Sequence, residues 1–178
     1  GSQDESGCHE CETGKFQTES GATACDACPA GTYVETKGST ACDDCQAGGF
    51  CEEAGADSAS VFEPCATGTW SDVVGANSPV FCRNCSAGRY SPISGATSNV
   101  TDCRPCRKGG VCSEGVPEPT DCVAGRFMNE TGATACMDCT VGAFCPSGAA
   151  AVLPCKGGSF GNATSLASQD DCHPCPPG

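Results

Sequence analysis

Cys28-Pro29-Ala30-Gly31-Thr32-Tyr33 is the stretch that decides the fold, because its pattern, Cys-x-x-Gly-x-aromatic, returns along the whole chain. Nine copies are present, and a tenth begins at Cys175-Pro-Pro-Gly178. They open at Cys11, Cys28, Cys45, Cys65, Cys85, Cys106, Cys122, Cys139 and Cys155. The last position holds an aromatic residue in eight of the nine, with Val111 as the exception. Self-similarity of this kind predicts a repeat protein whose units pack on their neighbours.

The glycine never changes within the array, which predicts a positive φ or a position too crowded for a Cβ atom. The fixed aromatic position predicts a ring packed between consecutive disulfide layers, with an exposed row of rings for ligands as the alternative. A second signal, Gly-Ala-Thr or Gly-Ser-Thr just before the closing cysteine, occurs at Gly21, Gly38 and Gly132. It predicts a turn that returns a short hairpin to its start.

Counting the cysteines gives a pairing scheme. Most opening cysteines are closed by the next cysteine in the chain. In three units an extra cysteine directly follows the aromatic position, at Cys51, Cys112 and Cys145, and the next opening cysteine has no partner three residues before it. The extra cysteine therefore closes its own loop. The predicted pairs are Cys11–Cys25, Cys28–Cys42, Cys45–Cys51, Cys65–Cys82, Cys85–Cys103, Cys106–Cys112, Cys122–Cys136, Cys139–Cys145 and Cys155–Cys172.

Two cysteines, Cys8 and Cys175, are left over by this scheme. Stacked units would keep them apart, so we expect both partners to lie outside residues 1–178. Either the same repeat continues beyond both ends, or copies join end to end through disulfides.

The composition indicates an oxidising, extracellular compartment. Leu, Ile, Val and Phe number 21 of 178 residues, whereas there are 20 cysteines. Cross-links replace buried apolar area in such chains. Four triplets have the form of N-glycosylation acceptors, at Asn84, Asn99, Asn129 and Asn162. We expect the last three to be exposed and glycosylated, whereas Asn84 stands between Cys82 and Cys85, where a glycosyltransferase has little room.

The fold class expected is a small disulfide-rich protein: an elongated tandem array of short β-hairpin and loop modules with little or no helix. Residues 1–10 end a preceding module, 11–45 hold two long-loop repeats and 82–106 hold one. A short loop followed by a long loop makes up each of 45–82, 106–139 and 139–172, and 172–178 begin a further repeat. A rod of nine such units has a radius of gyration of about 26 Å, against about 16 Å for a compact domain of this length. Small-angle scattering measures it, and a value below about 20 Å contradicts the expectation.

The net charge of −13 argues against nucleic acid and anionic lipid as partners. Residues 1–60 carry twelve acidic and two basic residues, and 83–108 carry five basic residues and one acidic residue. This asymmetry suggests that copies associate through these two regions, in contacts that salt weakens, although two differently solvated faces are the simpler interpretation.

No catalytic residue, cofactor or metal ligand is expected. Seven Cys-x-x-Cys pairs could bind zinc, but the glycine-aromatic loops and the secreted composition favour disulfides. The two histidines, His9 and His173, have no nucleophile or carboxylate partner by motif. Acidic residues beside cysteines lack the regular spacing of a calcium loop, so solvated carboxylates are expected. They are Asp26, Asp43, Asp44, Asp138, Asp170 and Asp171.

The opening motif with its closing Cys-x-x-Cys resembles the ephrin-receptor-like cysteine-rich repeat. It is also similar to the cysteine-rich modules of tumour-necrosis-factor receptors and growth-factor receptors. Residues 142–146 and 153–161 look most like the long-array versions of the repeat. The resemblance implies stacked hairpins in an extracellular setting and does not imply one ligand.

The function expected is therefore a non-enzymatic extracellular rod in a filament or surface coat, with proteins or copies of itself as partners. The alternative is a receptor or adhesin ectodomain that binds a protein ligand. For that alternative, residues 51–82 are the place to look, because they contain a long loop and the off-motif Phe62 and Phe81.

Overall fold

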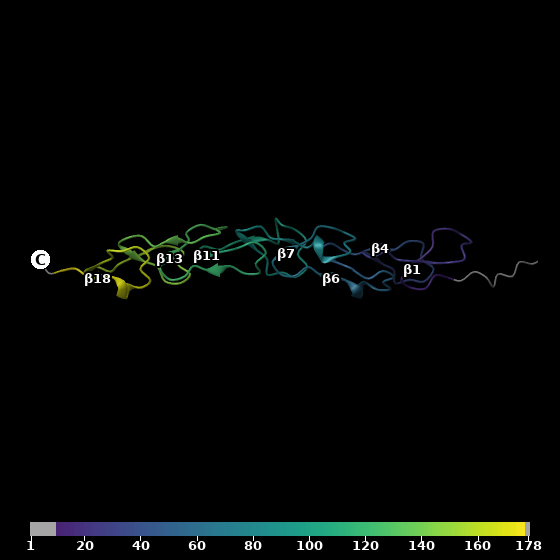
Figure 1. Cartoon of the computed structure of the whole chain (residues 1–178), viewed down its shortest axis with the longest axis horizontal. Coiled ribbons are helices and arrows are strands. Elements are labelled where there is room, and N and C mark those ends of the chain that lie inside the picture. The colour runs from purple at the N-terminus through teal and green to yellow at the C-terminus, as the bar shows by residue number, and fades with distance from the viewer. Residues whose placement is uncertain (1–9, 177–178) are drawn as a thin grey trace, which may run out of the picture. The chain divides into compact units, whose positions relative to one another are not determined.

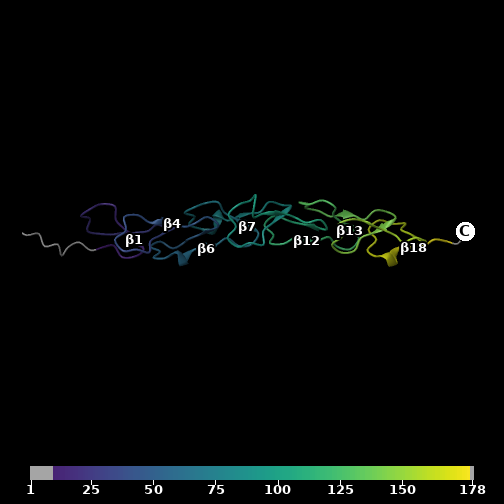
Figure 2. The ribbon, with the colours of Figure 1, turned by 180° about the vertical axis from the view of Figure 1, so that it is seen from behind.

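The computed structural model describes residues 10–176 (Figure 1; Figure 2 shows it from behind). Each opening motif ends in a two-residue strand that contains the aromatic position. These strands are β1 (Lys15–Phe16), β3 (Thr32–Tyr33), β5 (Gly49–Phe50), β7 (Thr69–Trp70), β9 (Arg89–Tyr90), β11 (Gly110–Val111), β13 (Arg126–Phe127), β15 (Ala143–Phe144) and β17 (Ser159–Phe160). We number the modules 1 to 9 by their opening cysteines, from Cys11 to Cys155.

Each module closes with a second short strand. The closing strands are β2 (Asp26–Ala27), β4 (Asp43–Asp44), β6 (Glu63–Pro64), β8 (Arg83–Asn84), β10 (Arg104–Pro105), β12 (Thr120–Asp121), β14 (Met137–Asp138), β16 (Leu153–Pro154) and β18 (His173–Pro174). Every first strand pairs with the strand that follows it. The pairing is antiparallel, and the aromatic position faces the first residue of the closing strand, as in Tyr33 opposite Asp43. The predicted hairpin array is confirmed.

Helix is confined to three 3-10 turns in the described part of the chain: η2 (Ala59–Val61), η3 (Pro79–Phe81) and η4 (Gln169–Asp171). The abundance of turn residues explains this, because no window is long enough to nucleate an α-helix. None of the helical segments between residues 10 and 176 has the length and apolarity needed to cross a membrane.

The described residues form two compact units. The first comprises 10–66, 70–83 and 94–98, and the second comprises 67–69, 84–93 and 99–176. Strands β1 to β6 belong to the first unit and β9 to β18 to the second, whereas β7 and β8 contribute one residue to each. Within each unit the modules follow one another by the same local rules, described below.

Nine disulfides staple the modules, and they are the nine pairs that the counting scheme predicts. The short loops, such as Cys45–Cys51, have both cysteines buried. In a long loop such as Cys28–Cys42 the opening cysteine is fully buried, whereas the closing cysteine is only half-buried. The opening cysteine is buried in modules 1 to 8, whereas in module 9 the closing Cys172 is buried and the opening Cys155 is half-buried.

The aromatic rings do not fill the core in the way the sequence suggested. Only Phe50 and Phe127 are buried, Phe160 is 43% exposed, and the other rings are half-buried. Two positions are buried instead. One is the residue directly after the aromatic position, such as Val34 or Ser71, and the other is a small residue such as Ala76, which follows Gly75. Backbones of neighbouring modules approach within hydrogen-bonding distance, so the residue after the aromatic position is covered while the ring itself is not fully enclosed. The prediction that rings are sandwiched between disulfide layers is therefore only partly right.

Candidate functional site: the module boundaries

The boundary between consecutive modules is built from three backbone hydrogen bonds. At the boundary of modules 2 and 3, the Gly31 amide donates to the Cys51 carbonyl at 2.8 Å. The Val34 amide donates to the Ala56 carbonyl at 3.1 Å. In the opposite direction, the Gly55 amide donates to the Cys28 carbonyl at 2.7 Å. Backbone amides and carbonyls that are removed from water need hydrogen-bond partners, and these three bonds supply them at the boundary.

The same three bonds recur at all eight boundaries of the described chain, and each bond joins residues of one unit. The opening-glycine amides of modules 1 to 8 donate to the carbonyls of Val34, Cys51, Ser71, Ser91, Cys112, Met128, Cys145 and Gly161. The acceptors include valine, cysteine, serine, methionine and glycine. Because only the backbone takes part, the boundary tolerates this variety of side chains.

Nearly every module has a second glycine with positive φ, the one that Gly55 represents in module 3. The sequence pattern singled out only Gly21, Gly38 and Gly132. The others are Gly55, Gly75, Gly95, Gly115 and Gly148, and Ser165 takes the place in module 9. All nine have positive φ, including Ser165 at 60°. The signal that could have found them is distance, because each lies six or seven residues after the opening glycine.

The opening glycine is required for both of the predicted reasons, because its φ is positive and because its surroundings leave no space for a Cβ atom. Gly31 has a φ of 93°, and a Cβ atom there would lie 2.3 Å from the carbonyl oxygen of Gly75. Gly75 belongs to module 4, so the contact reaches two modules along the array and not one. Equivalent contacts of 2.1 to 2.4 Å occur for the opening glycines of modules 1 to 7. In modules 8 and 9, Gly142 and Gly158 keep the positive φ but meet nothing within 4 Å.

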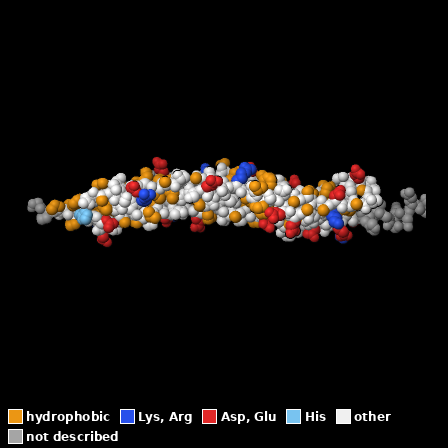
Figure 3. All heavy atoms as spheres, in the orientation of Figure 1, with side chains coloured by type: hydrophobic (Ala, Val, Ile, Leu, Met, Phe, Trp, Pro, Cys, Tyr) orange, Lys and Arg blue, Asp and Glu red, His pale blue; other side chains and the backbone are white. Residues whose placement is uncertain are grey.

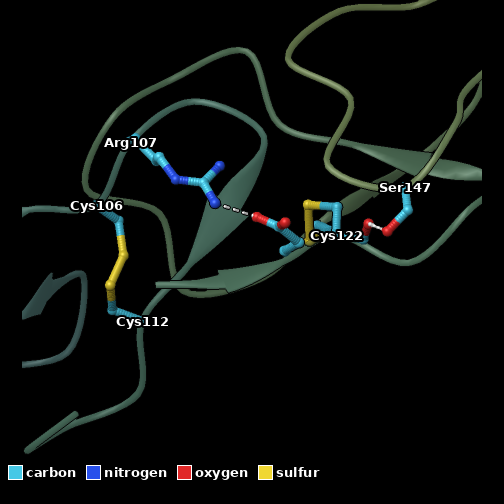
Figure 4. A network of polar contacts seen from close by, with 7 residues as sticks. Cys106, Arg107, Cys112, Cys122 and Ser147 are labelled. Atoms are coloured by element: carbon cyan, nitrogen blue, oxygen red, sulfur yellow. Dashed lines mark hydrogen bonds and ion pairs between the residues drawn. A yellow bond between two sulfur atoms is a disulfide. The ribbon is translucent and has the colours of Figure 1, made fainter. Parts of the chain in front are cut away.

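Side chains reinforce some of these boundaries (Figure 4). The Cys122 carbonyl accepts the Gly148 amide at 2.7 Å and also the Ser147 hydroxyl at 3.3 Å. In module 5, Ser94 adds the same bond to the Cys65 carbonyl at 3.2 Å. A serine just before the second glycine therefore strengthens the shared backbone contact.

Cys175 occupies the place of an opening cysteine. Its amide donates to the Gly158 carbonyl at 2.9 Å, and every earlier opening cysteine from Cys28 to Cys155 makes the equivalent bond. The Cys175 thiol is exposed and forms no disulfide with another described residue. Cys8, the other cysteine left over by the count, lies outside the described residues, as does His9.

The off-motif rings in 51–82 pack on module 3. A Cβ atom on Gly49 would lie 2.4 Å from the ring of Phe62, so this glycine makes room for the ring. Phe81 ends η3, which contacts β5. Both rings are half-buried, and Phe62 is among the residues that line the pocket described below.

The basic residues of 83–108 are partly neutralised within the chain. Arg83 pairs with Asp72 at 2.6 Å, and Arg107 pairs with Asp121. Both acids lie outside the basic region. On the face in Figure 3, several acidic side chains likewise lie beside a basic one. These pairs weaken the suggested attraction between copies, because part of the positive charge is already satisfied.

Lys37 in the first unit is similarly paired. Its ammonium group lies 2.6 Å from a carboxylate oxygen of Glu12. This hydrogen bond, together with the negative charge of Glu12, raises the pKa of Lys37 above its ordinary value. Both side chains are exposed, so the pair is easily screened by salt.

The last loop of module 9 is organised by Asp171. Its Oδ2 atom accepts the Ser168 and Ala167 amides, both at 2.9 Å, and these bonds lower the pKa of the Asp171 carboxyl below its ordinary 3.8. The pKa of Asp171 is lower in the folded chain than in the unfolded chain. The stabilisation that its carboxylate gives the folded chain is therefore complete above the ordinary pKa and is lost as the pH falls through the folded pKa.

We expect the Ala167 and Ser168 amide signals to titrate in NMR with a midpoint below 3.8. Asp171→Asn should abolish that titration, and a midpoint at or above 3.8 contradicts the assignment.

The candidate glycosylation asparagines differ in accessibility. Asn129 and Asn162 are exposed, as predicted. Asn99 is not: it is half-buried, and its Oδ1 atom is buried without a hydrogen-bond partner. The backbone of this segment is held by Arg89, whose guanidinium donates to the main-chain carbonyls of Asn99 and Cys103. Asn84 is exposed in β8, with its amide 3.4 Å from Glu114.

The remaining candidate residues form no metal centre within the described part of the chain. No group of three or more His, Cys, Asp or Glu residues in 10–176 is arranged to hold a metal ion. His173 lies in β18, where its ring faces Phe160 with the centroids 6.1 Å apart. Asp26, Asp43 and Asp44 are exposed on closing strands.

A pocket of about 260 Å³ lies beside modules 2 and 3 in the first unit. It is lined by Tyr33, Asp44, Cys45, Gln46, Ala59, Ser60 and Phe62. Two aromatic residues, a carboxylate and an amide therefore surround one small cavity.

Residues 1–45 match the family model described as tyrosine-protein kinase ephrin type A/B receptor-like. The resemblance inferred from the opening motif is confirmed over that part of the chain, which includes the disulfides Cys11–Cys25 and Cys28–Cys42. A search of curated protein sequences found no match to the chain.

Proposed function

We propose that this chain is a segment of a non-enzymatic extracellular structural rod, part of a filament or a surface coat. The observation that carries the proposal is the set of three backbone hydrogen bonds repeated at all eight described boundaries. Such a boundary lets modules of different sequence stack in the same way, and it favours extension by repetition. An array of this kind suits spacing and mechanical support.

An extracellular location is supported by the nine disulfides, since a cytosol would keep these thiols reduced. The match of residues 1–45 to a receptor-like cysteine-rich family points the same way. The proposed organisation follows the predicted segments: short-loop modules 3, 6 and 8 are each followed by a long-loop module, giving 45–82, 106–139 and 139–172.

The second candidate function is a receptor or adhesin ectodomain that binds a protein ligand. It is favoured by the receptor-like family model and by the aromatic pocket beside modules 2 and 3. Both candidates take proteins as partners, either other chains or copies of this one.

Immunogold electron microscopy separates the two functions. Antibodies raised against the disulfide-bonded chain are applied to the native source, and the pattern of gold particles is recorded. A structural role predicts labelling along continuous filaments or a coat at a regular spacing. Isolated particles at the plasma membrane, without any filament or coat beneath them, contradict the structural proposal and favour the ectodomain.

Glycans on Asn129 and Asn162 are expected when the chain is made in a eukaryotic secretory pathway. Both side chains are exposed, whereas the buried Oδ1 atom of Asn99 predicts a lower occupancy there. Peptide mapping by mass spectrometry after enzymatic deglycosylation measures all three, and Thr131→Ala and Thr164→Ala serve as controls that remove individual acceptors. Unmodified Asn129 and Asn162 in secreted material would falsify the expectation.

A further inference from the structure

Module 4 contains a cation held between an aromatic ring and a carboxylate. The guanidinium carbon of Arg83 lies 4.7 Å from the centroid of the Trp70 ring. The same guanidinium is 2.6 Å from Asp72. Asp72 lies two residues after the aromatic position, and Arg83 directly follows the closing cysteine, Cys82. Ring stacking and ion pairing together suit arginine, whose planar guanidinium can do both at once.

Module 2 has an aromatic ring and a carboxylate at the equivalent positions but lacks the cation. Tyr33 holds the aromatic position, and Glu35 lies two residues after it. The place of Arg83 is taken by Asp43, which follows Cys42 and lies opposite Tyr33 in the hairpin. Module 2 therefore has the negatively charged Asp43 at the position where module 4 has the positively charged Arg83.

Tyr33 of this arrangement lines the pocket, whereas Glu35 and Asp43 do not. The other lining residues include the aromatic Phe62 and the polar Asp44 and Gln46. Glu35 is next to the pocket, because a Glu35 carboxylate oxygen accepts the amide of Ala59, another lining residue, at 3.0 Å. Among the described residues, Asp43 and Asp44 have no ion-pair partner.

Size and charge limit what the pocket can accept. A volume of about 260 Å³ is below the range typical of pockets for drug-sized ligands, and it suits one side chain. Three carboxylates lie in or beside the pocket and its ring, which favours a positive charge. Module 3 offers no second site of this kind, because its ring, Phe50, is buried.

We propose that this pocket binds an arginine side chain of a partner protein, which completes in trans the arrangement that Arg83 completes in cis. The inference goes beyond a structural role for the chain, because it assigns a specific contact to modules 2 and 3. It does not depend on whether the partner belongs to a filament or to a ligand.

The probe is the blocked peptide acetyl-Gly-Arg-Gly-amide, titrated into the isotope-labelled, disulfide-bonded chain and followed by NMR. We expect saturable shifts of the amides of Tyr33, Gln46, Ala59 and Phe62. The matched peptide with neutral citrulline in place of arginine should bind at least about fivefold more weakly, and the lysine peptide should also bind more weakly. Asp44→Asn should weaken arginine binding about threefold.

Two matched variants decide between a site and general attraction. Asp43→Arg supplies module 2 with its own cation and should weaken peptide binding more than about tenfold. Asp26→Arg makes the same charge change at the equivalent position of module 1, after Cys25, and should leave binding nearly unchanged. Equal losses in both variants, equal binding of the citrulline peptide, or shifts spread over the acidic surface without saturation would each overturn the proposal.

Discussion

Gly31→Ala should destabilise the packing of modules 2 to 4 by about 3 kcal/mol or more. The φ of 93° alone costs an alanine about 1–2 kcal/mol. The new Cβ atom would also lie 2.3 Å from the Gly75 carbonyl oxygen, which is held in place because the Gly75 amide donates to Cys45. The strain therefore cannot be relieved by moving a flexible side chain, and the backbone of module 4 has to shift.

Hydrogen–deuterium exchange measures this effect locally, which is necessary because repeat arrays do not unfold as one unit. We expect exchange of the Gly31, Gly55 and Gly75 amides to accelerate about a hundredfold or more. Gly142→Ala is the matched control, since Gly142 has a φ of 85° and an open surrounding space. It should show only the smaller cost of the positive φ. Effects of the same size in both variants would show that the contact across two modules does not matter.

Complete reduction of the disulfides should unfold the chain without any denaturant. The buried positions are mainly cysteines with small side chains between them, so no apolar core is left to oppose chain entropy. Each long loop, whose cysteines have a sequence separation of 14 to 18, contributes roughly 3 kcal/mol by restricting the unfolded chain. NMR amide dispersion before and after thiol treatment measures the loss, and dispersion retained after complete reduction contradicts the prediction.

The order of reduction is also predicted. The short-loop bridges Cys45–Cys51, Cys106–Cys112 and Cys139–Cys145 have both cysteines buried, so a thiol reagent cannot reach them in the folded chain. Long-loop bridges with a half-buried cysteine, such as Cys28–Cys42, should open first. Timed alkylation with peptide mapping reads this order, and early loss of the short-loop bridges would contradict it.

The sequence by itself determined the modules and their staples. An opening cysteine every 16 to 21 residues defines the repeat, and the extra Cys51, Cys112 and Cys145 can close only their own loops. These are local facts, since a loop and its cysteine lie within one stretch of chain. The demand for glycine at Gly31 was likewise visible, because nothing else holds the position throughout the array.

Only the tertiary structure decided what Gly31 meets and where the rings lie. The carbonyl against Gly31 belongs to Gly75, two modules away, and no sequence period states which turn packs on which. Tyr33 and Phe160 were expected inside and are only partly covered, because the position buried between modules is the residue after the aromatic position, such as Val34 or Ser71. Local loop closure can be read along the chain, whereas contacts between modules depend on a stacking geometry that the chain order does not contain.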